Sequence, residues 1–408
     1  MKRIRPICVF SEGISYCHIV RPLVVASWLR DLSIPIVVAC NQRSQGLFAA
    51  AGFRTVRIVT ADAGPIYRRL ARGKWLYEFD DLLTYFRDDE RLIASLDPQL
   101  IVADFRFSLL QLAKKHGIPA VGITSASCHP AFPLDGSTPD PFAKPAFVPC
   151  PVFDALQKTW LGNIARRRVV SAISENLQRA SEASGVEVLD SFFEYASQGD
   201  VCLLSDHPRV MPLPALRPGD LYAGALIWDR EDPLPEALPA VERNGSTIYI
   251  SVGTQEALPT DFLGSLIRPL VDRGFQVIVS KGHRSFEIGI QHPLLTVVDF
   301  INESRLLPKV DLFVNAGSAM SVYHGLYFGI PMICLPIQAD QHYHAEAVAR
   351  EGVGVYFRPS RLKVGDVVDA AAALMANSSV RGRCASLAKD VQTFRPKDTV
   401  LTRVGKLV

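Results

Sequence analysis

The 408-residue sequence lacks any uninterrupted run of roughly 18 apolar residues, the length that a helix needs to cross a membrane. Its first apolar run, residues 7–10, is too short for the core of a secretory signal peptide. A repeat of short period is missing as well. We therefore predict a globular, cytoplasmic protein without a transmembrane span.

The sequence also lacks closely spaced cysteine pairs and the residue spacing of a metal site. The eight cysteines are scattered along the chain, with no C-x-x-C pair and no zinc-like spacing to histidines. We predict reduced, buried thiols. The acidic residues 80–81 and 88–90 lie in polar helical context, so we interpret them as solvated helix faces. We expect the protein to need no metal and no other cofactor.

An excess of one charge sign is absent too. The chain has 44 basic and 41 acidic side chains, a formal net charge of +3, and no long block of one sign. Nucleic-acid-binding proteins usually carry a concentrated basic surface, so we do not expect nucleic acid as a partner.

What the sequence does have is short runs rich in valine and isoleucine that alternate with helical patterns. Near-continuous apolar strands joined by amphipathic helices indicate parallel sheets covered on both faces. The chain is longer than one hydrophobic core usually spans, which favours two domains. We predict an α/β protein with two Rossmann-like, doubly wound domains. The expected strands include residues 7–10, 34–40, 99–105, 118–124 and 201–205, and a second series starts at residue 246.

The domain boundaries follow from composition. Residues 228–245 are rich in proline and charge, which is typical of a linker. We place the N-terminal domain at residues 1–227 and the C-terminal domain at 246–385. Residues 129–190 interrupt the strand pattern, and two interpretations stay open for them: a solvated helical excursion, or a lid over a binding site.

Small and polar residues follow three expected strands of the C-terminal half. Parallel sheets bind ligands at the carboxyl ends of their strands, and a helix N-terminus there offers unpaired N–H groups to phosphate. Each group on its own is more often a helix cap. The groups are Gly253 and Thr254, then Gly317, Ser318 and Ser321, then Asp340 and Gln341.

The N-terminal half offers an acid/base candidate. His18 lies in the turn after the first strand, before a helix that we expect to begin near Arg21 and Pro22. Asp104 ends another strand at the same sheet edge. A carboxylate bound to one ring nitrogen would fix the imidazole tautomer and stabilise the imidazolium. Taken alone, a histidine in such a turn is usually a surface or capping residue.

The order and spacing of these motifs resemble a known family. The pattern SVGT, then VDFINESRLLPKVDLFVNAGS, then GIPMICLPIQADQHYHAEAVAREGVG is similar to the nucleotide-sugar signature of the UDP-glycosyltransferases. These are GT-B enzymes, such as the bacterial antibiotic and macrolide glycosyltransferases. The segments HIVRPL and ADFRFSL, the latter followed by GIPAVGIT, are similar to family patterns with a histidine–aspartate acid/base pair.

The resemblance implies a role for each matching residue. His18 would be the general base and Asp104 its partner. Phe300 would stack on the nucleobase, and Ile301 would offer its backbone to the base. The last segment, residues 386–408, would pack back on the N-terminal domain. The glycine and serine residues named above, with Thr254, would surround the diphosphate, while Asp340 and Gln341 would hold sugar hydroxyls.

This chain departs from the family pattern at five positions. Ala316 stands where a histidine is common at the diphosphate turn, and Ser321 replaces a threonine. His324 occupies the place of a glutamate that often touches the ribose, Asn302 replaces a proline, and Cys17 replaces a glycine. Losing one hydrogen bond to a charged phosphate costs about 1.5–3 kcal/mol unless Asn315 or a backbone amide replaces it.

The resemblance implies an inverting, metal-independent glycosyltransferase that uses a UDP- or dTDP-sugar and a small, partly apolar natural-product acceptor. Aromatic and polar side chains that would line the acceptor site are Trp75, Tyr77, His129 and Phe132, although such residues equally fill a small core. A homodimer is compatible with this prediction. Two alternatives stay open: a nucleotide-sugar epimerase of the same fold, and a non-catalytic nucleotide-binding partner protein.

Overall fold

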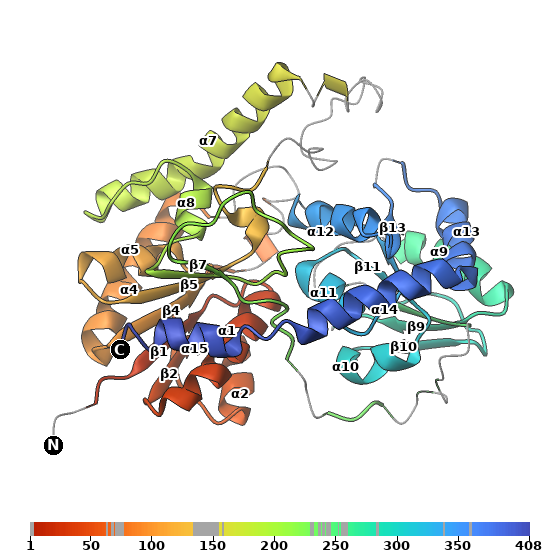
Figure 1. Cartoon of the computed structure of the whole chain (residues 1–408), viewed down its shortest axis with the longest axis horizontal. Coiled ribbons are helices and arrows are strands. Elements are labelled where there is room, and N and C mark those ends of the chain that lie inside the picture. The colour runs from red at the N-terminus through yellow and green to blue at the C-terminus, as the bar shows by residue number, and fades with distance from the viewer. Residues whose placement is uncertain are drawn as a thin grey trace. The chain divides into compact units, whose positions relative to one another are not determined.

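The computed structural model divides the chain into two compact units, which are described separately (Figure 1). The N-terminal unit combines residues 1–138, 144–228 and 395–408, and the C-terminal unit combines residues 139–143 and 229–394. The structure describes residues 4–62, 64–66, 69, 77–133, 155–156, 159–228, 232–235, 238, 241, 246–251, 253, 260–282, 285–337, 339–358 and 361–408.

The N-terminal unit is built on a seven-stranded, wholly parallel sheet with the order β3-β2-β1-β4-β5-β6-β7. Its central strands are buried on both faces, which explains their continuous apolar sequences. The strands are β1 (Ile7–Ser11), β2 (Ile36–Cys40), β3 (Arg54–Arg57), β4 (Leu100–Asp104), β5 (Ala120–Thr124), β6 (Val201–Leu204) and β7 (Asp220–Tyr222).

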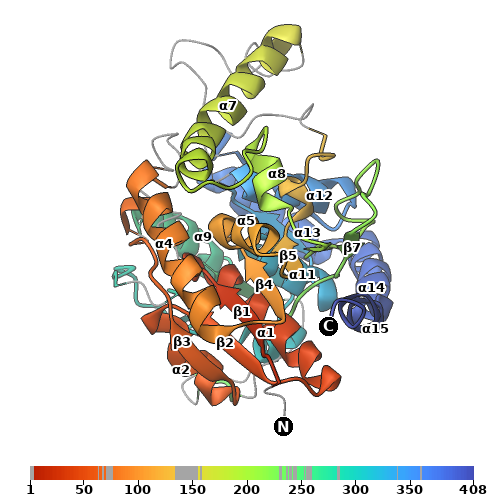
Figure 2. The same cartoon turned by 90° about the vertical axis from the view of Figure 1, so that its left-hand side faces the viewer.

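Helices cover both faces of this sheet, because right-handed crossovers change face where the strand order reverses (Figure 2). On one face lie α1 (Cys17–Leu29), α2 (Gln42–Ala50) and the C-terminal α15 (Lys397–Val404), which packs on α1. The other layer contains α4 (Phe79–Leu96), α5 (Phe107–Lys115), α7 (Trp160–Ala183) and α8 (Phe192–Ala196). Short 3-10 turns occupy Arg30–Leu32 and Ala126–Cys128.

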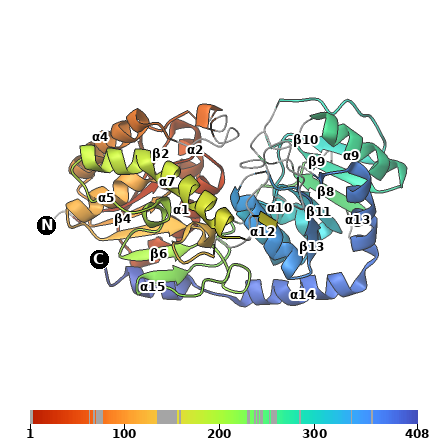
Figure 3. The same ribbon diagram turned by 90° about the horizontal axis from the view of Figure 1, so that it is seen from above.

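The C-terminal unit repeats this plan with a six-stranded parallel sheet of order β10-β9-β8-β11-β12-β13. Its strands are β8 (Thr247–Ser251), β9 (Gln276–Ser280), β10 (Leu295–Val298), β11 (Leu312–Asn315), β12 (Met332–Cys334) and β13 (Gly354–Tyr356). Its helices are α9 (Thr260–Asp272), α10 (Glu303–Leu306), α11 (Ala319–Tyr327), α12 (Ala339–Arg350), α13 (Val364–Ala376) and α14 (Ser378–Thr393), with a 3-10 turn at Leu307–Lys309 (Figure 3).

The predicted fold class, two doubly wound parallel-sheet domains, is confirmed. Helix α1 begins at Cys17, earlier than the expected start near Arg21, and encloses Pro22. Proline has no N–H, so the carbonyl of His18 loses its helical partner. The Ser11 hydroxyl, at the end of β1, donates to that carbonyl at 2.7 Å instead. Among the described residues, no helix is long and apolar enough to cross a membrane.

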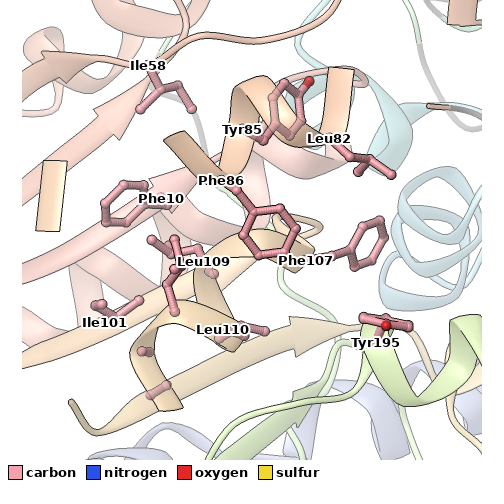
Figure 4. Packing of buried hydrophobic residues seen from close by; sticks show 14 of the residues in the cluster. Phe10, Ile58, Leu82, Tyr85, Phe86, Ile101, Phe107, Leu109, Leu110 and Tyr195 are labelled. Atoms are coloured by element: carbon pink, nitrogen blue, oxygen red, sulfur yellow. The ribbon is translucent and has the colours of Figure 1, made fainter. Parts of the chain in front are cut away.

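A buried ion network lies beside the apolar core of the N-terminal unit. In that core, Leu109 of α5 lies near Phe10 of β1, and Phe86 of α4 lies between Phe10 and Phe107 (Figure 4). The Arg106 guanidinium donates to Glu12 at 2.7 Å and to Asp89 at 2.9 Å, and all three side chains are fully buried. The network therefore ties the loops after β1 and β4 to helix α4.

This network corrects one sequence-based interpretation. Asp89 was expected on a solvated helix face, but its side chain is 0% exposed and also accepts from the Ser108 hydroxyl at 2.6 Å. Arg106 is 17 residues away in sequence, so helical periodicity alone cannot reveal the pair.

We predict that Arg106→Met destabilises the N-terminal unit by about 3–5 kcal/mol, because it leaves two buried carboxylates without their cation. Thermal unfolding followed by circular dichroism measures the change, with Arg87→Gln on the exposed face of α4 as the control. An unchanged unfolding midpoint in Arg106→Met would contradict the structural role of the network.

Candidate functional site

Each sheet reverses its strand order once, and the loops that flank this point diverge. In the N-terminal unit the reversal lies between β1 and β4, and in the C-terminal unit between β8 and β11. Ligands of open parallel sheets bind at such switch points. His18 follows β1, Asp104 ends β4, Gly253 follows β8 and Gly317 follows β11. The predicted residues therefore flank both switch points.

The structure brings His18 and Asp104 together. The Nδ1 atom of His18 lies 2.9 Å from Oδ1 of Asp104, whose carboxylate is fully buried. The His18 side chain keeps 13% of its surface exposed, so a ligand can reach its ring. An Nδ1–H that donates to Asp104 leaves Nε2 with a free lone pair, which is the tautomer that a general base requires.

Arg21 completes this pair and was not predicted. Its guanidinium donates to both carboxylate oxygens of Asp104, from Nε at 2.8 Å and from Nη2 at 2.7 Å, and from Nη1 to the Ser205 hydroxyl at 3.1 Å. Nη2 also lies 2.7 Å from Nδ1 of His18. Arg21 therefore holds the carboxylate by both oxygens and places a fixed positive charge beside the imidazole.

Phe105 supports the ring of His18. The two rings are stacked, with centroids 4.5 Å apart. Phe105 adopts a left-handed backbone conformation, with φ of +56°, which is unusual and costly for a non-glycine residue. The neighbouring Arg106 belongs to the buried ion network, which holds the loop in this conformation. The strain is thus located directly under the candidate base.

Cys17 adds an ionisable neighbour to His18. Burial opposes the charged imidazolium, but the Cys17 thiolate and the Asp104 carboxylate outweigh it and raise the pKa of His18 to about 9. Burial likewise opposes the thiolate, yet His18 and Arg21 lower the pKa of Cys17 to about 7. The Cys17 Sγ also lies 2.8 Å from the Ser15 hydroxyl. The residue in place of the family's glycine therefore affects the protonation of the candidate base.

The predicted diphosphate turn precedes helix α11. Gly317 has a left-handed φ of +73°, and a Cβ there would lie 2.9 Å from the Gln341 carbonyl oxygen, so the turn and α12 approach closely only with glycine. The Ser318 hydroxyl caps α11 by accepting from the Ser321 N–H at 3.3 Å. Gly253 has a φ of +72° and open space around it.

Two buried polar atoms near this turn have no hydrogen-bond partner among the described residues: Nδ2 of Asn315 and Nε2 of His324. The Asn315 Oδ1 accepts from the Gly317 N–H at 2.7 Å. Nδ1 of His324 pairs with Glu303 at 2.9 Å, and the Tyr249 hydroxyl donates to the same carboxylate at 3.0 Å. Burying an unpaired polar atom costs about 1–3 kcal/mol, which a bound ligand could recover.

Glu303 is the ionised partner in this cluster. Burial favours its neutral acid, but hydrogen bonds from His324 and Tyr249 outweigh burial and hold the pKa of Glu303 below its usual value. With Nδ1–H donated to Glu303, the Nε2 atom of a neutral His324 is a hydrogen-bond acceptor. A histidine that replaces the family's glutamate is thus held in one tautomer by a second acid.

The predicted sugar-binding pair lies at the start of α12. Asp340 is exposed, whereas Gln341 is buried and its Oε1 accepts from the Ile337 N–H at 2.9 Å. Ile301 is also buried, at 3% exposure, and Phe300 is half-buried. Thr254 lies outside the described residues.

The predicted acceptor residues are less accessible than expected. Tyr77 is 1% exposed and its hydroxyl lies 3.4 Å from Glu12, inside the buried network. His129 is also 1% exposed: Nδ1 accepts from Ala131 N–H at 3.1 Å, and Nε2 lies 2.8 Å from Asp220. Both side chains therefore contribute to the core. Phe132 is half-buried, and Trp75 lies outside the described residues.

The contact between Arg21 and His18 was not predicted because the helix was expected to begin near Arg21, whereas α1 begins at Cys17 and includes both residues. Residues three apart on a helix share a face, so Arg21 in α1 had to lie near His18. Glu303 carried no comparable local signal, because its partners Tyr249 and His324 come from other elements. Across the part of the chain that the structure describes, no group of three or more His, Cys, Asp or Glu residues could hold a metal ion.

Comparisons with known proteins agree with the predicted resemblance. Residues 271–404 match the family model described as Erythromycin biosynthesis protein CIII-like, C-terminal domain. The chain is 26% identical over 400 residues to the PGL/p-HBAD biosynthesis rhamnosyltransferase of Mycobacterium bovis (strain BCG / Pasteur 1173P2). The match covers 95% of this chain and 84% of that protein.

Solved structures share the fold over almost the whole length. The glycotransferase of kitacinnamycin has a TM-score of 0.71 at 17% identity and covers 98% of this chain and 99% of its own. The Streptomyces sp. SF2575 glycosyltransferase SsfS6, complexed with thymidine diphosphate, has a TM-score of 0.64 at 18% identity, with 99% and 100% coverage. The predicted GT-B architecture and the resemblance to natural-product glycosyltransferases are confirmed.

We predict that His18 titrates near pH 9 and that Cys17→Ser lowers this value, because the thiolate that stabilises the imidazolium is removed. The folded pKa exceeds the unfolded value of about 6.5, so the interaction stabilises the fold fully below that pH. Its contribution is lost as pH rises through about 9.

The measurement is a pH titration of ¹⁵N-histidine resonances by NMR, with the His18 signals assigned from their loss in His18→Gln. Titration of His18 at its ordinary pKa in the wild type would show that Cys17 and Asp104 do not stabilise the imidazolium.

Proposed function

We propose that this chain, a glycosyltransferase with the GT-B fold, transfers a sugar from a UDP- or dTDP-sugar to a hydroxyl of a small, partly apolar acceptor, with inversion at the anomeric carbon. The observation that carries the proposal is the 2.9 Å contact between His18 and Asp104 at a switch point. The glycine turn before α11, at the switch point of the other sheet, supports the donor half of the proposal.

The reaction is a single displacement. In its neutral form, which predominates above the pKa of about 9, His18 accepts the proton of the acceptor hydroxyl at Nε2 while the oxygen forms a bond to the anomeric carbon. The bond from that carbon to the diphosphate oxygen breaks, and nucleoside diphosphate leaves with the electron pair. Attack from the face opposite the leaving group inverts the configuration. The resulting imidazolium is stabilised by the Asp104 carboxylate.

The donor half neutralises the charge that develops on the diphosphate. The N-terminus of α11 provides unpaired N–H groups and a partial positive charge. Asn315, whose Nδ2 has no partner among the described residues, offers a donor near Ala316, where the family often has histidine. His324, held by Glu303, offers an acceptor for a ribose hydroxyl. The exposed Asp340 accepts from sugar hydroxyls.

Donor choice is the finer part of the proposal. A solved structure of similar fold contains thymidine diphosphate, which supports a dTDP-sugar as the donor. The similar protein named as a rhamnosyltransferase supports a deoxyhexose as the sugar. A dTDP-linked deoxyhexose and a UDP-hexose are therefore the first donors to compare. The scheme assigns the neutralisation of charge to N–H groups, so we expect activity without added divalent ions.

We predict that His18→Gln lowers donor consumption at least about a hundredfold, because general base catalysis contributes on this order. Calorimetry should show unchanged nucleotide affinity, since His18 lies in the unit that does not bind the donor. Mass spectrometry of reactions with an acceptor panel, in the presence of EDTA, measures turnover. Full activity in His18→Gln would refute the assigned base, and acceptor-independent release of an epimerised nucleotide sugar would favour an epimerase.

We predict a separate role for Arg21 as a positioning residue that acts through Asp104. Arg21→Gln removes a positive charge 2.7 Å from Nδ1 of His18, so the imidazolium becomes more stable. The pKa of His18 measured by NMR should rise by about one pH unit. Turnover should fall roughly ten- to a hundredfold.

Two variants separate this role from simple loss of stability. Arg21→Lys keeps the charge but cannot hold both oxygens of Asp104, so the titration should stay near that of the wild type while turnover falls. Arg217→Gln removes a similar two-oxygen contact to an aspartate, Asp220, and should leave the titration of His18 unchanged. An unshifted titration in Arg21→Gln would refute the positioning role.

A further inference from the structure

The N-terminal half of α7 and the residues just before it expose several large apolar side chains. Trp160 is 69% exposed, Ile164 42% and Val169 48%, and Leu156, just before the helix, is 43% exposed. Single exposed apolar residues are ordinary on a surface, but a cluster within one short stretch is characteristic of an interaction site. Trp160 and Ile164 are four residues apart and share one face of the helix.

The other half of α7 is anchored to the N-terminal unit. Leu177 and Ala180 are buried, and Asn176 donates to the Tyr77 carbonyl oxygen at 3.1 Å. The Arg179 guanidinium lies over the Phe79 ring, 4.8 Å from its centroid. In Figures 1 and 2 the anchored half lies along α4 and α8, and the N-terminal half extends beyond them. The helix thus extends its exposed half away from the sheet.

The charge of this stretch is of one sign. Residues 155–174 contain four basic residues, Lys158 and Arg166 to Arg168, and no aspartate or glutamate. Arg167 and Arg168 are exposed, one turn after Ile164. A projecting helix end with tryptophan, aliphatic side chains and arginine matches the composition of segments that bind at the interface of a bilayer. The rest of the chain is nearly balanced in charge, so this concentration is local.

We propose that the N-terminal half of α7 docks the protein on an anionic membrane surface, with Trp160 and Ile164 inserted at the level of the headgroups and Arg167 and Arg168 paired with lipid phosphates. The charge complementarity favours acidic lipids over neutral ones. The exposed tryptophan and aliphatic groups favour a bilayer over a nucleic acid, for which phosphate contacts without apolar insertion are usual. This inference concerns a surface outside the proposed active site and does not depend on it.

The test is flotation of the full-length protein with phosphatidylcholine vesicles, with and without about 30% phosphatidylglycerol, at low salt and at about 0.5 M NaCl, where charge is strongly screened. Binding should require the acidic lipid and weaken with salt. Tryptophan emission should shift to shorter wavelength on binding, and this shift should be absent in Trp160→Phe, which leaves three tryptophans of the original four.

Two double variants separate the apolar and the basic contributions. Arg167→Gln with Arg168→Gln should weaken the partition coefficient roughly thirtyfold, since each cation near the surface contributes a factor of about five. Trp160→Ser with Ile164→Ser should abolish the emission shift and weaken flotation. The matched control is Val188→Ser with Arg87→Gln, which removes an exposed valine and an exposed arginine elsewhere in the same unit and should bind as the wild type.

Three outcomes would overturn the proposal: no flotation with acidic vesicles, equal flotation with neutral vesicles, or binding that both double variants retain. If a single-stranded oligonucleotide displaced the protein from the vesicles and bound it as tightly as the vesicles do, the surface would be assigned to nucleic acid instead. Because all of these readouts are independent of sugar transfer, failure of the proposed enzymatic function would leave the result unaffected.

Discussion

The structure depends on one constraint: each parallel sheet reverses its strand order once. Crossovers on either side of that point leave on opposite faces, so two loops diverge there and expose the carboxyl ends of neighbouring strands. In the N-terminal sheet these loops carry His18 and Asp104, and in the C-terminal sheet they carry Gly253 and Gly317. The chemistry of each unit follows from which side chains the sequence places after these strands.

Buried charges hold the first of these sites in shape. The Asp104 carboxylate is fully buried, and the fork of Arg21 compensates the cost of desolvation with two charge-assisted hydrogen bonds. Arg106 does the same for Glu12 and Asp89 next to the strained Phe105. Replacing these ion pairs with apolar side chains would avoid the free-energy cost of desolvation, but the loops would lose the contacts that hold them. We infer that the ion pairs serve to fix the direction of the imidazole. This arrangement is consistent with a base whose tautomer matters.

Much of this could be read from the sequence, and the exceptions share a physical reason. Strands and their ends were predictable because Val- and Ile-rich runs and small residues are local signals, and strand order then brought His18 to Asp104. Asp89 was misread because its partner Arg106 is distant in sequence and only the tertiary fold buries both. Tyr77 and His129 looked like acceptor contacts because an aromatic or imidazole ring has the same local signature in a core as in a pocket.

The central claim is that the switch point of the C-terminal sheet binds the nucleotide diphosphate. Hydrogen–deuterium exchange, read by mass spectrometry with and without dTDP and UDP, tests it most directly because backbone N–H groups are the proposed ligands. We predict slower exchange in peptides that span residues 314–325, at the turn and the start of α11, with the strands of the N-terminal sheet unchanged. Nucleotide binding that leaves the exchange of residues 314–325 unaltered would contradict the account.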